Sequence, residues 1–358
     1  MSHPTPLRSF VGGLALPVPV HALMLLNGNV FGISGFIHRA AKGSIEAAAG
    51  VAGLVLGGML VAKLDGVAPP TLLLPGYQVA ASGFLVGLGT KLSNGCTSGH
   101  MVCGLSRFSL RSFAATLSFF TTGVITAHLF HGDLPAAGSL DWTLGTDGQK
   151  YLLAQAIPFA ASILLYAFGR QGKPKRRTEG SPPPPPLTEE ATLVNKSSQA
   201  HSTTPSNNAN EGESNPPQRL LRTLGFLTTG VQFALALTLS NLIDPIRVIS
   251  FLLLPFHRAF DPSLGFLAAG AMPLGILLYH RFRGGETPRL GGPWSIPKAG
   301  TVDLKLVGGA AIFGVGWGLA GVCPGPGLVN LGRAIVGGGD VSRFAIWLAA
   351  LVFGGLMV

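Results

Sequence analysis

The sequence contains little charge, and this shortage excludes whole classes of protein. Only 11% of the 358 residues are Asp, Glu, Lys or Arg, whereas a soluble domain carries about 25%. Hydrophobic residues make up 47%, and the mean hydropathy is +0.45. A soluble protein of this size needs more charge to cover its surface, and a disordered chain is far less apolar. We therefore expect an integral membrane protein with many spans.

Cysteine is also scarce, and several chemical signatures are missing. Three cysteines are too few for a disulfide framework, and an odd number leaves at least one thiol free. No Cys/His spacing resembles a zinc site, and no G-x-x-x-x-G-K-[ST] loop for nucleotides occurs. The N-terminus shows no removable signal peptide. We expect no metal, no cofactor and no nucleotide hydrolysis.

The net charge of +10 does not indicate nucleic-acid binding, because of where the charges lie. Basic residues gather at the ends of apolar stretches, as Arg107, Arg111, Arg281 and Arg283 do. That placement is typical of membrane flanks. The expected partner is therefore the lipid bilayer and not a nucleic acid.

Apolar stretches suited to membrane helices recur along the chain. They run near 10–37, 45–64, 79–90, 112–131, 151–169, 224–243, 262–280, 304–322 and 343–358. Several are shorter than the ~20 residues that span a bilayer. The stretches ending at Gly89 and around Gly314 continue into Gly- and Pro-rich sequence. We expect broken or re-entrant helices there, because bare backbone at that depth must be covered by protein or line a cavity.

One segment differs from everything else in composition. Residues 172–218 include five consecutive prolines and a long Ser/Asn-rich tract, which cannot bury enough apolar area to fold. Their basic start, Gly-Lys-Pro-Lys-Arg-Arg, places them in the cytoplasm by the positive-inside rule. We expect a disordered cytoplasmic linker between one membrane repeat (10–171) and a second (219–358).

The two halves share an internal repeat. Residues 87–96 and 314–323 both read G-x-G-x-x-L-x-x-x-C, at a constant separation of 227. The cysteines of the pair are Cys96 and Cys323, and a glycine-bearing kink follows each. Repeats with broken helices in matching positions indicate a transporter site near the midplane. A half-helix starting after the cysteine would direct its positive end at an anion.

These motifs resemble those of the YeeE/YedE sulfur-transport family. The first signature is NGCTSGHMVCGLSRFSLR at 94–111, and the second is FGVGWGLAGVCPGPGLVNLG at 313–332. Two weaker elements are GNVFGISGFI at 28–37 and NLIDPIRVISFL at 241–252. The resemblance covers nearly all of the membrane region but not the linker.

The resemblance implies a fold and an activity. The fold is an all-α polytopic membrane protein of two pseudo-symmetric, inverted repeats, whose broken helices meet at the midplane. The activity is uptake of thiosulfate or a related sulfur anion along a path with cysteine thiols, through what we expect to be the plasma membrane. The family's thiosulfate transporters have a further cysteine in the N-terminal element. Residues 32–35 here read Gly-Ile-Ser-Gly, so Ser34 would supply a hydroxyl instead.

The candidate pathway residues come from the same motifs. A neutral thiol is a weak donor that offers a soft contact to a terminal sulfur, and a path needs weak, serial sites so that the ion can leave. Hydroxyls and glycine N–H groups would donate to the oxygens. No catalytic or metal-binding residue is expected. The predicted pathway residues are Cys96, Cys323, Cys103, Thr97, Ser98, His100, Asn94, Gly95, Gly99, Pro324, Gly325, Gly327 and Ser34.

Several residues have two readings from sequence alone. His100 relays protons or binds the anion, or it is a helix-start histidine bonded to a carbonyl. Asn94 contacts the ligand or joins two half-helices. We expect Trp317 to pack in the core and Asp244 to cap a helix. We expect Arg107 and Arg111 to set the topology as positive-inside anchors.

Three functions remain open from the sequence. The first is uptake of thiosulfate or a related anion. The second is transport of another substrate, such as a selenium compound. The third is a membrane sulfur-relay protein that carries a persulfide on Cys96 or Cys323, and an intracellular sulfur-handling protein is a further candidate partner.

Overall fold

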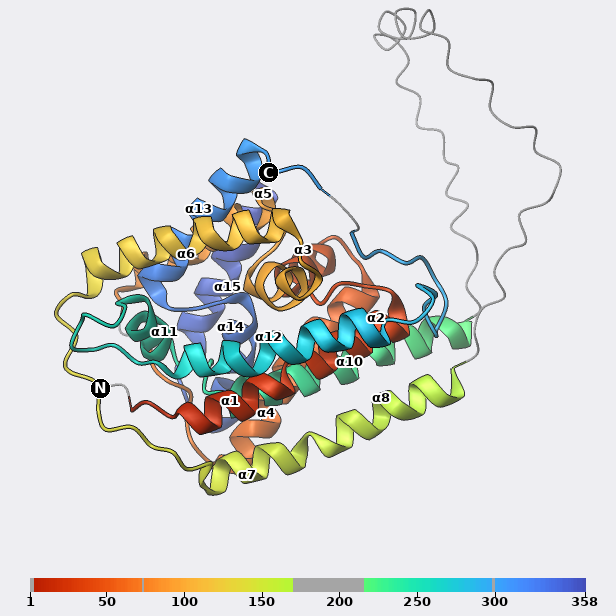
Figure 1. The fold of residues 1–358 in the computed structure, drawn as a ribbon. Helices are drawn as coiled ribbons and strands as arrows, with labels where there is room; N and C mark the ends of the chain where they lie inside the picture. The colour runs from red at the N-terminus through yellow and green to blue at the C-terminus, as the bar shows by residue number, and fades with distance from the viewer. Residues whose placement is uncertain (1–2, 73, 170–215, 298–299) are drawn as a thin grey trace, which may run out of the picture.

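The computed structural model describes residues 3–72, 74–169, 216–297 and 300–358. These residues form helices and connecting loops, and no strand occurs among them (Figure 1). The all-α polytopic membrane fold expected from the sequence is confirmed. The predicted linker at 172–218 lies outside the described residues except for its last three positions. Those three belong to a helix whose described residues run from Pro216 to Leu239.

Seven helical segments of the described chain are long and apolar enough to cross a membrane. They are α1–α2 (Pro6–Ala15 and Pro17–Asn27), α4 (Ile45–Asp65), α6 (Leu110–His131), α7–α8 (Gly145–Ala154 and Ala156–Phe168), α10 (Pro216–Leu239), α12 (Ser263–Phe282) and α13–α14 (Leu304–Ala320 and Pro324–Gly337). Large apolar side chains such as Leu129, Leu153 and Ile157 are exposed on these segments, as a lipid-facing surface requires.

Shorter helices lie between the spanning ones. They are α3 (Ile33–Ala41), α5 (Gly76–Leu92), the π-helix η1 (Ser98–Gly104), the 3-10 turn η2 (Leu105–Arg107), α11 (Pro245–Leu252) and α15 (Val341–Leu356). The apolar stretch at 10–37 is therefore not one helix. Gly28 ends α2 with a φ of +69°, and a side chain there would collide with Pro288 and Pro293, so the chain turns before α3.

Both predicted helix breaks are present. In the first half α5 ends at Leu92, Asn94 takes a left-handed conformation with φ +57°, and η1 starts at Ser98. In the second half α13 ends at Ala320, Gly321 has φ +67°, and Cys323 is the N-cap of α14. Any side chain at Gly321 would collide with the Pro245 carbonyl, so this break needs glycine twice over.

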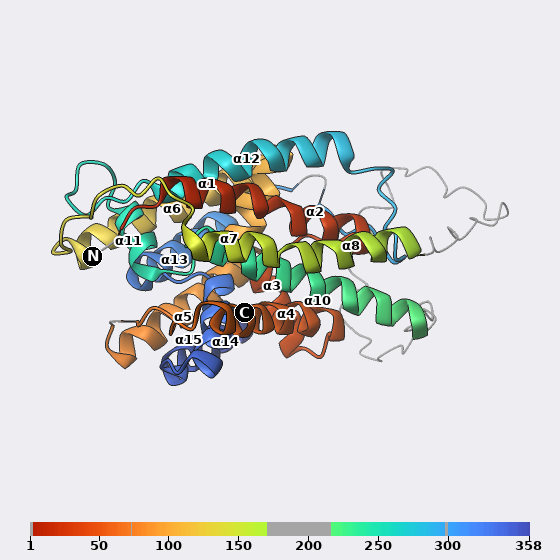
Figure 2. The same cartoon turned by 90° about the horizontal axis from the view of Figure 1, so that it is seen from below.

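Contacts between the helices fix their relative directions. The Arg8 side chain donates to the Leu239 carbonyl, and Asn27 donates to the Arg222 carbonyl, so α1–α2 runs antiparallel to α10. Arg222 also pairs with Glu46 at the start of α4, which makes α4 parallel to α10. The Thr5 amide donates to Ser263, which makes α12 parallel to α1. Figures 1 and 2 show α1 and α12 side by side in both views.

The packing partners also match when the halves are exchanged. Helix α4 packs on α10 as α12 packs on α1, α13 packs on α6 as α5 packs on α15, and α5 and α13 pack on each other. An inverted repeat requires these directions and pairings. The symmetry itself stays our interpretation of them.

Glycines let α5 and α13 cross closely beside the breaks. A β-carbon at Gly309 would lie 2.6 Å from the Ser93 amide, and one at Gly89 would lie 2.6 Å from the Gly309 carbonyl. Backbone-to-backbone packing of this kind is how membrane helices associate without a hydrophobic driving force. The crossing holds the two helices that lead into the breaks side by side.

We expect Gly309→Val to destabilise the protein by about 1–3 kcal/mol or more, because the added branches overpack this crossing. The neighbouring Gly308 is a matched control, since nothing lies within 4 Å of a β-carbon there. Both changes carry the same helix-propensity cost. Thermal unfolding of the detergent-solubilised protein should show a lower midpoint for Gly309→Val than for Gly308→Val. Equal midpoints would contradict the crossing.

Candidate functional site

A cavity of about 170 Å³ lies where the two broken helices meet. The first break supplies Cys96, Thr97 and Ser98, and the second supplies Cys323, Pro324, Gly325 and Pro326. A buried water needs about 10–15 Å³ measured in this way, so the space holds several waters or a small anion. Most of the remaining wall is apolar and comes from both halves: Leu16, Ile33, Met101, Val102, Phe120, Phe233, Leu237, Leu242, Phe251, Leu264, Leu267, Ala268 and Trp317.

The Cys96 thiol is fixed by its neighbours on the first break. It is 1% exposed, and its Sγ lies 3.3 Å from the Ser98 hydroxyl. Ser98 in turn accepts a hydrogen bond of 3.2 Å from the Ile33 amide at the start of α3. The N-terminal element is therefore tied to the first break through a hydroxyl.

The second thiol is joined to the first break directly. Cys323 is 4% exposed, and the Thr97 hydroxyl donates to its Sγ over 3.5 Å. A single hydroxyl thus bridges the two halves at the cavity. The sequence repeat predicted equivalent positions for the two cysteines, and in the structure both line the same cavity.

The start of α14 presents few free donors to the cavity. Pro324 and Pro326 have no N–H group, and the Gly327 amide donates to the Cys323 carbonyl over 2.9 Å. This leaves the Gly325 amide as the donor of the first turn beside the cavity. Gly327 is not among the lining residues, and a side chain there would meet the Trp347 ring at 2.9 Å. Its small size serves packing.

His100 lies behind the first break and not in the cavity. Its Nε2 is 3.3 Å from the Ser93 carbonyl and its Nδ1 is 3.2 Å from the Ser112 hydroxyl. A carbonyl only accepts, so Nε2 carries the proton and Nδ1 accepts from Ser112. The ring lies against Gly95, where a β-carbon would be 2.7 Å from Nε2. The carbonyl-bonded reading of His100 is the one that the structure shows.

Other predicted pathway residues also lie away from the cavity. Asn94 is exposed at the left-handed turn, and Gly99 has open space around its α-carbon. Ser34 is buried on α3, but its neighbour Ile33 lines the cavity in its place. Cys103 lines a different pocket, on the other side of η1, where its thiol faces the Phe31 carbonyl at 3.7 Å.

Trp317 is a residue that sequence reasoning assigned to packing. Its ring does pack edge-on against Phe119 at 5.8 Å. The same side chain lines the cavity, where its buried indole N–H lies near the Cys323 thiol and makes no closer hydrogen bond. Its unusual place in a Gly-rich repeat was the only signal that the sequence offered.

No charged side chain lines the cavity among the residues that the structure describes. Buried charges are paired elsewhere: Arg247 with Asp261 at 3.2 Å, and Arg333 with Asp65 at 3.0 Å. Asp244 accepts from the Ile246 amide and caps α11, as predicted. The cavity is therefore an uncharged space with a few weak donors.

Comparison with known proteins identifies the chain. The model of the sulphur-transport family matches residues 7–126, and that of a family of unknown function, DUF6691, matches residues 221–358. A "probable transporter" of Xylella fastidiosa strain 9a5c is 40% identical over 120 residues, which are 33% of this chain and 89% of that protein. The chain belongs to the YeeE/YedE-like sulfur-transporter family.

A second relative gives the same result. A "probable transporter" of Xylella fastidiosa strain Temecula1 is 38% identical over 127 residues, covering 35% of this chain and 81% of that protein. Both relatives are much shorter than this member of the sulfur-transporter family. No solved structure matches the chain significantly. The family and the membrane helices together make this protein a sulfur-related membrane transporter.

We expect His100→Ala to lower the stability of the first break without removing a substrate contact. The buried Ser112 hydroxyl would lose its partner, at a cost of about 1–3 kcal/mol for the unsatisfied group, and the Ser93 carbonyl would keep only its bond from Arg111. Thermal unfolding should show a clearly lower midpoint. His128→Ala, at an exposed histidine of α6, is the control and should unfold close to the parent. A parent-like midpoint for His100→Ala would remove this role.

Proposed function

We propose that the protein takes up thiosulfate or a related sulfur anion through the central cavity. The observation that carries the proposal is the meeting of Cys96 and Cys323, one from each half, in a single uncharged space bridged by Thr97. Family membership makes a sulfur compound the expected cargo.

The cavity chemistry suits an anion with a soft end and a hard end. Dehydrating a divalent anion is costly unless donors replace water. The hydroxyls of Thr97 and Ser98, the Gly325 amide and the Trp317 indole N–H can donate to the oxygens. The two thiols offer weak S–H contacts to the terminal sulfur, and the apolar remainder of the wall keeps bulk water out.

The absence of lining charge among the described residues favours passage over storage. A guanidinium or ammonium in the cavity would hold a dianion tightly, whereas conduction needs sites weak enough to release it. The positive end of α14 supplies partial charge at its first turn without a full cation. Transport thus follows from weak donors placed in series.

The alternative cargoes and roles are weaker on this geometry. A persulfide-carrying cysteine usually has a base or a cation beside it, and no described lining residue is either. The substrate range is more open, because the N-terminal element has no cysteine and Ser34 is not among the residues that line the cavity. A selenium analogue would use the same donors.

We further propose that the protein resides in the plasma membrane with residues 172–218 on the cytoplasmic side. Their basic start supports this orientation. Cargo delivered there would meet an intracellular sulfur-handling protein.

We expect Cys96→Ala and Cys323→Ala each to reduce thiosulfate uptake at least tenfold, because each removes a contact to the terminal sulfur. The assay is labelled-thiosulfate uptake, with growth on thiosulfate, in cells lacking their own sulfate and thiosulfate uptake. Thr229→Val is the control, since this buried hydroxyl of α10 bonds only within its helix and lies off the cavity.

The outcomes separate the candidate functions. Uptake by the parent and loss in both cysteine variants, at equal membrane levels, supports the thiol path. Full uptake in both variants contradicts it. Selenium-compound uptake without thiosulfate uptake changes the cargo. A persulfide on Cys96 or Cys323 by mass spectrometry, with no uptake, would instead favour the relay.

We expect Trp317→Phe to raise the KM for uptake about three- to tenfold, since one hydrogen bond contributes about 0.5–1.5 kcal/mol. The phenyl ring lacks the N–H donor and is smaller than the indole, and the control below shares that loss of volume. Trp347→Phe is the matched control, because its indole N–H donates to Ser82 over 3.0 Å away from the cavity. That control should leave KM unchanged. An unchanged KM for Trp317→Phe would exclude the indole as a donor to the cargo.

A further inference from the structure

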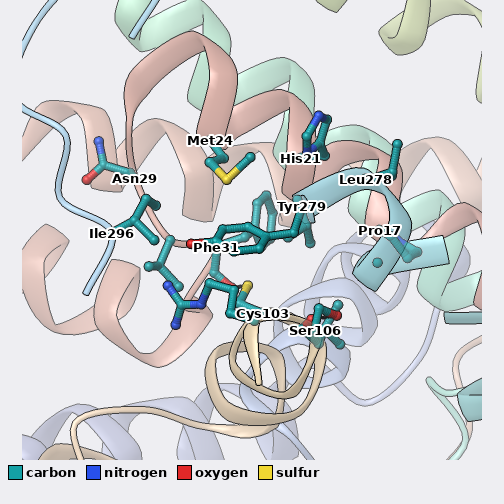
Figure 3. Close-up of a pocket in the computed structure, with 15 residues that line it drawn as sticks. Pro17, His21, Met24, Asn29, Phe31, Cys103, Ser106, Leu278, Tyr279 and Ile296 are labelled. Carbon is teal, nitrogen blue, oxygen red and sulfur yellow. Dashed lines mark hydrogen bonds between the residues drawn. The ribbon is translucent and has the colours of Figure 1, made fainter. Parts of the chain in front are cut away.

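A second pocket lies beside the η1–η2 segment, and Figure 3 shows the residues that line it. It holds about 40 Å³, enough for two or three waters or a small anion. Its walls come from α2, residues 29–31, the η1–η2 segment and α12. Figure 3 shows the Cys103 sulfur directed toward Phe31, with Tyr279 beyond that ring. Val102 lines both spaces, so the two are direct neighbours.

The pocket contains a cation without a counter-charge. Arg107 lines it, and the Nε and Nη1 atoms of Arg107 are buried with no hydrogen-bond partner. The other buried guanidiniums described above face carboxylates: Arg222 faces Glu46, Arg247 faces Asp261, and Arg333 faces Asp65. No acidic side chain is among the described residues lining this pocket.

Arg107 is half-buried, and its two buried, unpartnered nitrogens call for an anion. Removing a charge from water costs several kcal/mol unless a partner and hydrogen bonds replace the water. The planar guanidinium fork matches two oxygens of one oxoanion. The Nε and Nη1 atoms of Arg107 are both buried and unused, so each can donate one hydrogen bond to an oxygen of an anion.

The neighbouring polar groups leave the Nε and Nη1 atoms of Arg107 free to bind a ligand. The Ser106 hydroxyl already donates to the Val102 carbonyl, and the Asn29 amide donates to the Asn27 carbonyl. The Cys103 thiol points at the Phe31 carbonyl. Tyr279 accepts a hydrogen bond from Arg283, which leaves its own hydroxyl proton free to donate.

We propose that this pocket is a second binding site for the transported anion, in which Arg107 holds the oxoanion end of the cargo. The inference rests on the proposed uptake function and adds a second binding site to the transport path. The pocket lies toward the end of α2, where Asn27 meets Arg222 near the start of α10. That is the end of the bundle to which the 172–218 segment connects. The central cavity supplies weak uncharged contacts, and this site supplies the cation just beyond the η1 partition.

Arg107 could equally serve as a charge that orients the helix, and a matched arginine separates the two roles. Arg281 lies at the same end of α12, is exposed, and is not among the residues that line the pocket. Arg281→Gln removes the same charge from the same end without changing the pocket lining. Arg107→Lys keeps the charge and loses the fork.

The experiment measures equilibrium binding of labelled thiosulfate to the purified full-length protein in lipid nanodiscs. The starting protein is the Cys96→Ala, Cys323→Ala variant, in which the central site is weakened. We expect it to retain a saturable binding phase. Adding Arg107→Gln should weaken that phase at least tenfold, adding Arg107→Lys should weaken it less, and adding Arg281→Gln should leave it unchanged.

The result that overturns the inference is a binding phase that survives Arg107→Gln, or its absence in the double-cysteine variant while the parent still transports. Failure of the proposed function looks different. In that case the parent shows no thiosulfate uptake, whatever the binding data are. Arg107-dependent binding without uptake would keep the site and reject the transport route.

Discussion

The structure depends on satisfying bare backbone at two helix breaks inside an apolar protein. In a bilayer no water can bond to an exposed carbonyl or amide. The Ser93 carbonyl at the first break accepts from both His100 and Arg111, and the Gly95 amide donates to the Thr90 carbonyl. At the second break the Gly321 amide donates to Trp317. These bonds leave side-chain hydroxyls, thiols and one indole N–H to face the cavity.

The glycines make this arrangement possible by bringing the breaks together. Helices α5 and α13 cross at Gly89 and Gly309 with almost no space between their backbones. A similar contact between α6 and α13 occurs at Gly314, where a side chain would collide with Phe119 and Thr122. The Thr97 hydroxyl then reaches the Cys323 thiol of the other half. The close packing of α13 on α5 and α6 thus brings the two breaks near enough for their side chains to meet at the cavity.

The sequence predicted the class of fold, both breaks and the pairing of Cys96 with Cys323, because composition and a repeated motif carry that information directly. It could not predict which face of each break looks into the cavity. That choice depends on how each half-helix is rotated about the break, which packing decides. Four motif residues do not line the cavity: Asn94, His100, Gly327 and Cys103. Trp317 does line it, although its position in an apolar run predicted a core residue. The break between α2 and α3 was also missed, since Gly28 interrupts a stretch whose composition stays apolar.

Charge is distributed in a way that fits a route rather than a trap. Two deeply buried arginines, Arg247 and Arg333, face carboxylates and fix loops and helix ends to one another. The central cavity has no such group among the described residues, so a dianion there is held by dipoles and weak donors alone. The unpartnered Nε and Nη1 atoms of Arg107 lie in the neighbouring pocket, across Val102. An ion leaving a weak central site toward a nearby cation moves down in electrostatic energy before it reaches water, and the partition of η1 and Phe31 keeps the two sites from merging into one strong one.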